Sequence, residues 1–242
     1  MCATFDKYAQ RGAYHWASLS GNPWRHHCPT VARYQAVLKA WPCWHGVTVV
    51  DVGCGDGALA GCLVKAGASV TGVEPDSVGR QLAQQEFARR GLAGIFVPRL
   101  ADLPDDTFDV AVCSDVIEHV EYPEQLLRDL RRVIKPGGSV VVTTPIRLTE
   151  TPLDPFHVQE FFPGPFQTLM ESLFTEVQIQ RHIPLAGLML YYWRPWFFLR
   201  RPLINRLCNL LNICFGINPV ATINALDRYH LLQLAVAIKP GR

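Results

Sequence analysis

The chain has 242 residues, and 23 Lys and Arg against 21 Asp and Glu give a formal net charge of +2. This balance gives no overall field that would attract nucleic acid, and the length suits one α/β domain with a substantial core. The eight cysteines include no Cys-x-x-Cys pair and no zinc-ligand spacing. The first residues lack the basic and apolar regions of a secretory signal, so we expect the reducing cytoplasm.

Residues 1–30 combine aromatic, histidine and turn-forming residues in an order that fits no regular element, for example Tyr14-His15-Trp16. Two interpretations stay open for this segment: a lid over a ligand cleft, or padding of a sheet edge. Helical spacing follows from Thr30 to Trp41 and places Arg33 on a neighbouring face.

The most informative stretch of the chain begins at Val47. A β-branched run to Val52 predicts a buried strand, and Gly53, Gly55 and Gly57 follow at alternate positions before helical spacing begins. Glycine allows a sharp turn and lets a ligand approach main-chain N–H groups. The pattern therefore predicts a strand, a tight loop and a helix N-terminus.

A second strand and a carboxylate strengthen this interpretation. Ser69–Val73 reads as a strand, and Glu74 stands at its end. A carboxylate roughly 20 residues beyond such a loop can accept hydrogen bonds from both hydroxyls of a ribose. We expect a nucleoside-containing ligand across the carboxyl ends of these strands. The alternative is a purely structural one, in which the glycines form a tight turn and Glu74 is an acidic residue at the surface. A dehydrogenase fits less well, because its G-x-G-x-x-G fingerprint is not matched.

Strands and helices continue to alternate along the chain. The expected elements are a helix at 76–90, a strand at 94–97, a strand at 108–113, a helix at 123–134, a type II turn at 135–138 and a strand at 139–144. A helix at 166–173, a sixth strand at 174–183 and a last strand at 230–238 follow. This alternation predicts a mostly parallel sheet covered on both faces.

An insertion at 185–227, expected to be helical, separates the last two strands. From Val177 to Leu226 there is no acidic residue, whereas arginines stand beside Trp and Tyr as at a lipid–water interface. Pro195, Pro202 and several asparagines interrupt the apolar run, which argues against a transmembrane helix. We expect a roof over a lipophilic acceptor that also touches a membrane. A roof alone or a dimer contact are the alternatives.

A run of acidic and histidine residues follows the fourth strand. Asp115, Glu118 and His119 would share one face if this segment were helical. They could then hold a divalent cation, Mg²⁺ or Zn²⁺, that also binds neighbouring oxygens of an acceptor. His157 could complete the ligand set or act as a general base. In the structural alternative Asp115 caps a turn and His119 is a packed histidine.

Four motifs together resemble the class I S-adenosylmethionine-dependent methyltransferases: Asp51–Gly57, Glu74, Phe108-Asp109-Val110 and Leu130–Gly138. Within that class, three further features are similar to the ubiquinone-biosynthesis O-methyltransferases. These features are Arg33, the run Asp115-x-x-Glu118-His119, and His157-x-x-x-Phe161.

The resemblance implies one Rossmann-like methyltransferase domain over 1–242, with seven strands and the last strand antiparallel beside the sixth. It also implies that Arg33 pairs with the methionine carboxylate of the cofactor and that Glu74 holds the ribose. Arg99 stands where many relatives have an acidic residue, and this departure bears on the adenine contact expected at Ala101 or Asp102. The expected cofactor-binding residues are Arg33, Asp51, Gly53, Cys54, Gly55, Gly57, Glu74, Pro75, Ala101, Asp102 and Ser114.

The expected function is O-methylation of a hydroxyl on a lipophilic or aromatic small molecule, with S-adenosylmethionine as donor. His157 and His119 are the expected catalytic residues, and Asp115, Glu118 and His119 the expected metal ligands. The alternatives are N- or C-methylation of a glycan or secondary metabolite, or a non-catalytic cofactor-binding scaffold. RNA methylation fits less well, because the net charge is small. We expect a monomer or homodimer in the cytoplasm, in peripheral contact with a membrane.

Overall fold

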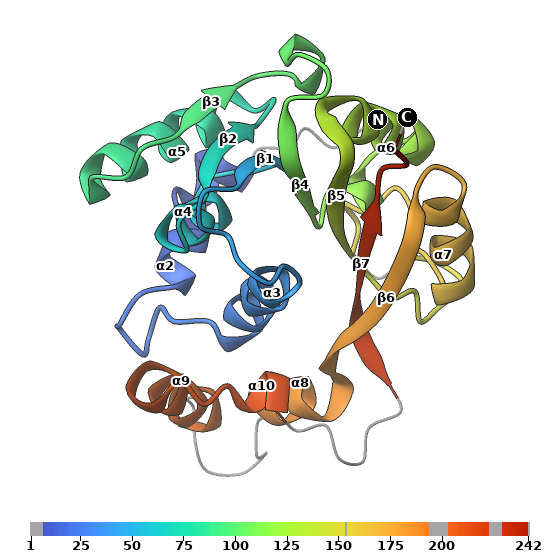
Figure 1. The fold of residues 1–242 in the computed structure, drawn as a ribbon. Coiled ribbons are helices and arrows are strands. Elements are labelled where there is room, and N and C mark those ends of the chain that lie inside the picture. The colour runs from blue at the N-terminus through green and yellow to red at the C-terminus, as the bar shows by residue number, and fades with distance from the viewer. Residues whose placement is uncertain (1–6, 153, 194–202, 223–228, 242) are drawn as a thin grey trace.

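The computed structural model describes residues 7–152, 154–193, 203–222 and 229–241. Its centre is one sheet of seven strands, ordered β3-β2-β1-β4-β5-β7-β6 (Figure 1). The strands are β1 (Thr48–Val52), β2 (Ser69–Val73), β3 (Ile95–Val97), β4 (Phe108–Ser114), β5 (Ile134–Pro145), β6 (Thr175–Pro184) and β7 (His230–Ile238).

Six of these strands run in the same direction, and β7 runs antiparallel between β5 and β6. The expected Rossmann-like sheet, with its last strand inserted beside the sixth, is therefore confirmed. The α-helices of the described residues are α1 (Lys7–Arg11), α2 (Tyr14–Ser18), α3 (Cys28–Lys39), α4 (Ala58–Lys65), α5 (Ser77–Arg90), α6 (Pro123–Val133), α7 (Pro163–Glu171), α8 (Leu185–Tyr192), α9 (Leu203–Phe215) and α10 (Pro219–Thr222).

Local chemistry sets several element ends. The Asp76 carboxylate accepts a hydrogen bond from the Gly79 backbone N–H (2.7 Å) and so caps the N-terminus of α5. Gly91 ends the same helix in the left-handed region, at φ 63°. Pro123 begins α6, where a missing backbone N–H removes no helical bond.

Helices cover both faces of the sheet, as expected. One face packs on α3, α4 and α5 through buried Val37, Leu63 and Phe87. The other packs on α6 and α7 through buried Leu127 and Phe166. Because β1, β4 and β5 lie between the two layers, each has a buried apolar run at its centre.

The insertion and the N-terminal segment form a further layer beyond one end of the strands (Figure 1). Buried Asn209 on α9 accepts hydrogen bonds from Cys28 Sγ (3.2 Å) and Tyr191 Oη (3.1 Å). Its amide donates to the carbonyls of Pro23 (2.8 Å) and His26 (2.7 Å). These bonds fix α9 against the start of α3, with a small apolar cluster beneath them.

The backbone differs from expectation in one detail. The predicted turn at Lys135–Gly138 lies inside β5 as a bulge, because Phe108 pairs with Ile134 while Val110 already pairs with Ser139. Gly137 takes the positive φ of 77° that this detour needs.

Candidate functional site

The carboxyl ends of β1, β2 and β4 open into a cavity of about 380 Å³. Eleven of the residues singled out from the sequence line it: Arg33, Asp51, Gly53, Cys54, Glu74, Pro75, Ser114, Asp115, Glu118, His119 and His157. The sheet order brings them together, because the polar residues that follow neighbouring parallel strands emerge at one edge.

The glycine loop and Glu74 form one hydrogen-bonded unit at this edge. Glu74 Oε2 accepts the Gly55 N–H (2.9 Å), and Oε1 accepts the Asp76 N–H (2.8 Å). Gly53 has φ 74°, and a Cβ there would collide with the side chain of Val116. The loop therefore needs glycine both for its backbone angle and for the close approach of the segment after β4.

Asp51 on β1 is a second buried carboxyl in the cavity wall, with only 1% of its surface exposed. Its Oδ2 has no hydrogen-bond partner among the described residues. Burial, and then the nearby Glu74 carboxylate, raise the pKa of Asp51 to about 7. Burial also raises the pKa of Glu74. Two carboxyl groups with raised pKa values are suited to a ligand that brings positive charge.

Arg33 on α3 reaches the cavity from the opposite side and forms an ion pair with Asp115. Asp115 Oδ1 also accepts a hydrogen bond from Thr143 Oγ1 (3.1 Å), which is hydrogen-bonded to Ser114 Oγ (2.9 Å). Arg33 Nε is buried without a partner among the described residues. The guanidinium is thus held at the cavity wall with donor capacity left for an anionic group.

The segment after β4 does not have the geometry that a shared helix face requires. Asp115 has φ 54°, and only Ile117–His119 form a single 3₁₀ turn. Asp115 therefore faces Arg33, while Glu118, His119 and His157 come together: one ligand-type atom from each lies within 4.8 Å of the others. Within the described residues the candidate metal group thus contains His157 in place of the expected Asp115.

Backbone bonds bring His157 to this cluster from a distant loop. Glu118 O accepts the N–H groups of Val158 (2.9 Å) and Gln159 (3.2 Å). His119 Nδ1 bonds to the Phe156 carbonyl (2.8 Å), and because a carbonyl only accepts, this nitrogen carries the proton. The rings of His119 and His157 stand edge to face at 4.9 Å.

Carboxylates orient the rest of the cluster. His157 Nδ1 bonds to buried Glu160 Oε1 at 2.7 Å, which leaves Nε2 as the basic nitrogen. Glu118 is fully buried; its Oε2 accepts a bond from Thr144 Oγ1 (3.0 Å), and its Oε1 has no partner among the described residues. Burial, and then Asp115, raise the pKa of Glu118, whereas burial lowers that of His119. A neutral imidazole can accept a proton or bind a cation.

Four of the residues expected to bind the cofactor do not line the cavity. Gly55 and Gly57 lie behind it in the loop, where Gly57 caps the N-terminus of α4. Ala101 and Asp102 form a short turn outside the lining, with Asp102 paired to Arg99 (2.8 Å).

Sequence reasoning did not assign Tyr8, Tyr14, Tyr34 or Asp154 to the site, yet all four line the cavity. The aromatic composition of residues 1–30 was the available signal for the first two. Asp56 holds this segment: its carboxylate accepts the His15 N–H (2.9 Å), and its carbonyl accepts the Trp16 indole N–H (2.7 Å).

Residues 50–142 match the family model described as "Methyltransferase domain". The ubiquinone biosynthesis O-methyltransferase of Pseudomonas paraeruginosa is 36% identical over 103 residues, covering 41% of this chain and 44% of the relative. The enzyme of that name from Sodalis glossinidius is 34% identical over 148 residues, covering 59% of this chain and 57% of the relative. The chain thus spans about half the length of these curated relatives.

Among solved structures, a SAM-dependent methyltransferase from Archaeoglobus fulgidus superposes with a TM-score of 0.60 at 20% identity, covering 89% of this chain and 96% of that one. Residues 50–142 thus match a methyltransferase domain, and the chain shares the fold of this solved S-adenosylmethionine-dependent methyltransferase. Its expected resemblance to the ubiquinone-biosynthesis O-methyltransferases is likewise confirmed.

Proposed function

We propose that the chain transfers a methyl group from S-adenosylmethionine to a hydroxyl of a lipophilic or aromatic small molecule. The observation that carries this proposal is the meeting of two sets of groups in one cavity: the Glu74 glycine-loop unit, and the histidine pair His119 and His157. A donor site and a base are what a displacement at a sulfonium methyl group requires.

On the donor side, the residues present fit the cofactor. Glu74 stands where a carboxylate holds ribose hydroxyls, and Arg33 Nε offers a donor to the methionine carboxylate. Asp51 supplies a buried carboxyl for the positive charge of the donor. Tyr8 and Tyr14 cover this part of the cavity from the N-terminal segment, which supports the lid interpretation of residues 1–30.

On the acceptor side, His157 is the proposed general base. A phenolic hydroxyl has an ordinary pKa near about 10, so it must lose its proton to become a good nucleophile at neutral pH. Glu160 fixes the ring of His157 so that Nε2 receives this proton, and the carboxylate then stabilises the imidazolium. His119, held by the Phe156 carbonyl, is positioned to bind the same hydroxyl.

As an alternative to the histidine base, the same cluster suits a divalent cation. In metal sites a ligating histidine commonly donates its second ring N–H to a carbonyl or carboxylate, as His119 and His157 do here. The unpartnered Oε1 of Glu118 would be the third ligand. When bound, Mg²⁺ or Zn²⁺ would favour ionisation of an acceptor hydroxyl. Dialysis against a chelator tests this: activity that falls and returns with one of these ions supports the cation, and unchanged activity removes it.

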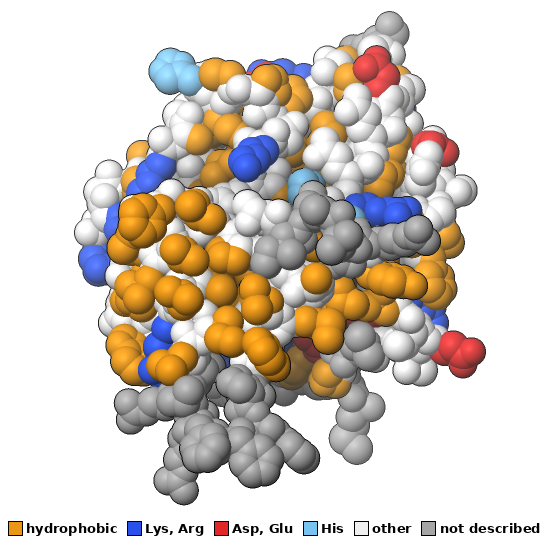
Figure 2. Space-filling model, turned by 90° about the horizontal axis from the view of Figure 1, so that it is seen from below, with side chains coloured by type: hydrophobic (Ala, Val, Ile, Leu, Met, Phe, Trp, Pro, Cys, Tyr) orange, Lys and Arg blue, Asp and Glu red, His pale blue; other side chains and the backbone are white. Residues whose placement is uncertain are grey.

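An apolar face beside the site supports a lipophilic acceptor and peripheral membrane contact. No helix in the described part of the chain combines the length and apolarity needed to span a bilayer. Hydrophobic side chains nevertheless gather on the face formed by α8–α10 (Figure 2). Those most exposed include Met189 (64%), Trp193 (57%), Leu207 (59%) and Phe215 (73%). Trp196 and Phe197, expected to contribute, lie outside the described residues.

The activity is tested by incubating the chain with methyl-labelled S-adenosylmethionine and a prenylated catechol, then seeking a product heavier by one CH₂. We expect labelled product and S-adenosylhomocysteine in equal amounts. Tight cofactor binding without turnover on any phenol would instead favour a non-catalytic scaffold. Label on nitrogen or carbon would favour the alternative methyltransferases.

Membrane contact is tested separately by liposome flotation of the wild-type chain and of Trp193→Ser/Leu207→Ser. We expect the variant to float less, because two exposed apolar side chains are lost. The substitution Ile95→Ser, at an exposed position on β3, is the matched control. Equal flotation of wild type and variant would contradict membrane contact through this face.

A further inference from the structure

A second cavity, of about 900 Å³, adjoins the cofactor cavity. The two share Tyr14, His15, Arg33 and Asp154 in their walls. The second cavity lies between the N-terminal segment, the start of α3, and helices α8 and α9. The second cavity is therefore next to the one that His157 lines.

The charges lining this cavity are unbalanced. Arg11, Arg25 and Arg206 line it, and no carboxylate in the described ranges forms an ion pair with any of them. Arg33 is neutralised by Asp115. Asp154 supplies the single carboxylate among the described lining residues, so three guanidinium groups against one carboxylate leave a formal charge of +2.

The histidines in the wall add hydrogen-bonding groups. His26 Nδ1 lies 2.8 Å from the Ser20 carbonyl oxygen, and His26 Nε2 lies 2.7 Å from the side-chain oxygen of Asn212. Burial, and then the Arg33 charge, lower the pKa of His27 to about 4, so this ring is neutral at pH 7. His27 also caps α3, and Thr30 and Arg33 from the first turns of that helix line the same wall. The positive end of the helix dipole therefore adds to the arginine charge.

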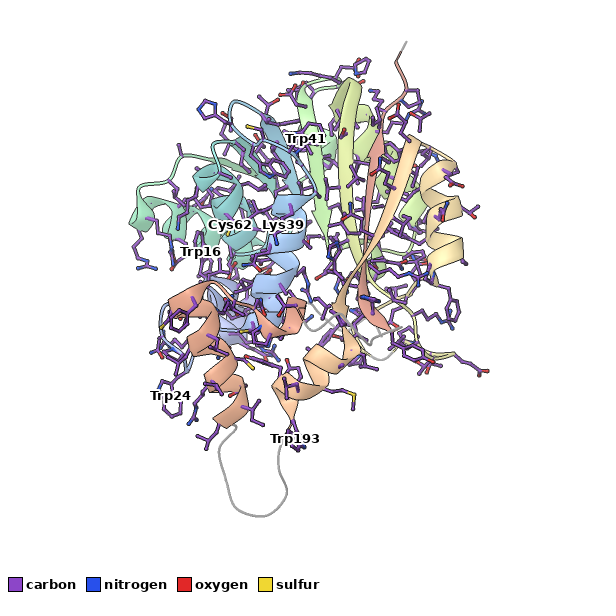
Figure 3. The ribbon with its side chains drawn as sticks, turned by 60° about the horizontal axis from the view of Figure 1, so that its bottom comes forward. Trp16, Trp24, Lys39, Trp41, Cys62 and Trp193 are labelled. Atoms are coloured by element: carbon purple, nitrogen blue, oxygen red, sulfur yellow. The ribbon has the colours of Figure 1, made fainter. Side chains whose placement is uncertain are left out.

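The cavity wall is held in place rather than loosely assembled. Asn209, whose four hydrogen bonds join α9 to the N-terminal segment, is itself a lining residue. The Arg206 guanidinium lies over the Trp24 ring at 3.3 Å, which limits the positions of both side chains. Figure 3 shows Trp24 beside α9 and Trp193 at the end of α8, at the end of the molecule that carries the apolar face.

We propose that this second cavity binds a phosphoryl group, as phosphate ester or diphosphate, carried by the methyl acceptor. The inference rests on the proposed function for the identity of the acceptor, whereas the anion site rests on the arginines alone. A phosphoryl group carries a charge of about −1.5 to −2 at pH 7. This charge balances the formal +2 of the cavity better than the single negative charge of a carboxylate ligand would. Planar guanidinium groups also bind phosphate through paired hydrogen bonds. Exposed Leu207 follows Arg206 on α9, so an apolar tail would leave toward the α8–α10 face.

Calorimetric titration of the chain loaded with S-adenosylhomocysteine tests the site. The probes are inorganic phosphate, inorganic pyrophosphate, dodecyl phosphate below its micelle concentration, and dodecanoate. We expect dodecyl phosphate to bind most tightly. Arg25→Gln/Arg206→Gln should weaken it at least about tenfold, since charge-assisted hydrogen bonds are lost. A second variant, Arg11→Gln/Arg25→Gln, changes only exposed arginines and guards against misfolding of the first.

The matched control is Arg128→Gln/Arg131→Gln, in a separate arginine-lined groove on α6. We expect it to leave dodecyl phosphate binding unchanged. Equal binding by wild type and both cavity variants, or an equal loss in the α6 control, overturns the site. Dodecanoate binding as tightly as dodecyl phosphate overturns the phosphoryl assignment. Inorganic phosphate binding as tightly overturns the assignment to an acceptor with an apolar tail. Failure of the wild-type chain to bind S-adenosylhomocysteine would instead contradict the proposed function.

Discussion

The proposed donor and acceptor sides of the cavity are built in different ways. The donor side comes largely from one continuous stretch, β1 to the start of α5, in which Glu74 bonds to Gly55 only 19 residues away. The acceptor side joins Glu118 and His119 to a loop almost 40 residues later, and the adjoining basic cavity joins His26 to Asn212 across 186 residues. The proposed cofactor site is thus local in sequence, whereas the proposed acceptor site depends on distant segments.

This difference predicts separable mutant phenotypes. Variants on the donor side should change cofactor affinity, and variants on the acceptor side should change turnover. Variants in the outer layer should change stability without changing cofactor affinity.

The largest expected effect is that of His157→Ala on turnover. Removal of a general base should lower kcat/KM by about 10²–10³-fold, with S-adenosylhomocysteine affinity unchanged within about twofold. The measurements are steady-state kinetics and calorimetry. His182→Ala, a half-buried histidine of β6 outside the cavity, should retain activity. A parallel loss of cofactor affinity in His157→Ala would erase the separation of the two sides.

Glu74→Gln should lower S-adenosylhomocysteine affinity by about 100-fold, since two charge-assisted hydrogen bonds that organise the loop lose their charged acceptor. Calorimetry measures the dissociation constant directly. Glu86→Gln, which alters an ion pair on α5 with Arg89, is the control and should bind normally. Normal affinity in Glu74→Gln would show that this carboxylate does not serve the donor.

Asn209→Ala should lower the free energy of unfolding by about 2 kcal/mol, because buried donors and acceptors on Cys28, Tyr191, Pro23 and His26 lose their partner. Urea denaturation measures this. Asn205→Ala on the same helix should change stability by no more than about 0.5 kcal/mol. Cofactor affinity should be unaffected by either change. A large loss of cofactor affinity in Asn209→Ala would show that the outer layer contributes to cofactor binding.

The smallest expected effect concerns Asp51 and pH. Its pKa of about 7 lies above the ordinary value of 3.8, so the folded chain binds this proton more tightly than the unfolded chain does. The stabilisation is complete below pH 3.8 and is lost as pH rises to about 7. Between pH 6 and 7 the cofactor-free wild type should lose about 1 kcal/mol more stability than Asp51→Asn. Urea titrations at both pH values check this, and identical pH profiles would contradict it.

The sequence predicted the sheet well, and it also predicted which residues would gather at the proposed donor side, because both depend on local patterns. The β-branched run at Val49–Val50, the alternate glycines and Glu74 each act on residues near them in the chain. Their periodicity and turn chemistry are therefore readable without tertiary contacts. The insertion was also predicted to contain helices, since a segment of about 40 residues is longer than an ordinary loop.

The acceptor side could be predicted only in part. Glu118, His119 and His157 could be singled out by residue type, but not the positive φ of Asp115 that turns this carboxylate toward Arg33. Lys135–Gly138 was expected as a separate turn because sequence shows the turn residues but not the strand register in which they form a bulge.

The sequence by itself determined a Rossmann-like methyltransferase sheet with a glycine loop and a carboxylate at its edge, because hydrophobic periodicity and backbone freedom are properties of short segments. Only the tertiary structure decided that His157 meets Glu118, that Tyr8 and Tyr14 line the first cavity, and that Arg11, Arg25 and Arg206 line a second cavity beside it. Those contacts arise when the sheet and the outer layer pack, and packing joins residues whose separation along the chain carries no periodic signal.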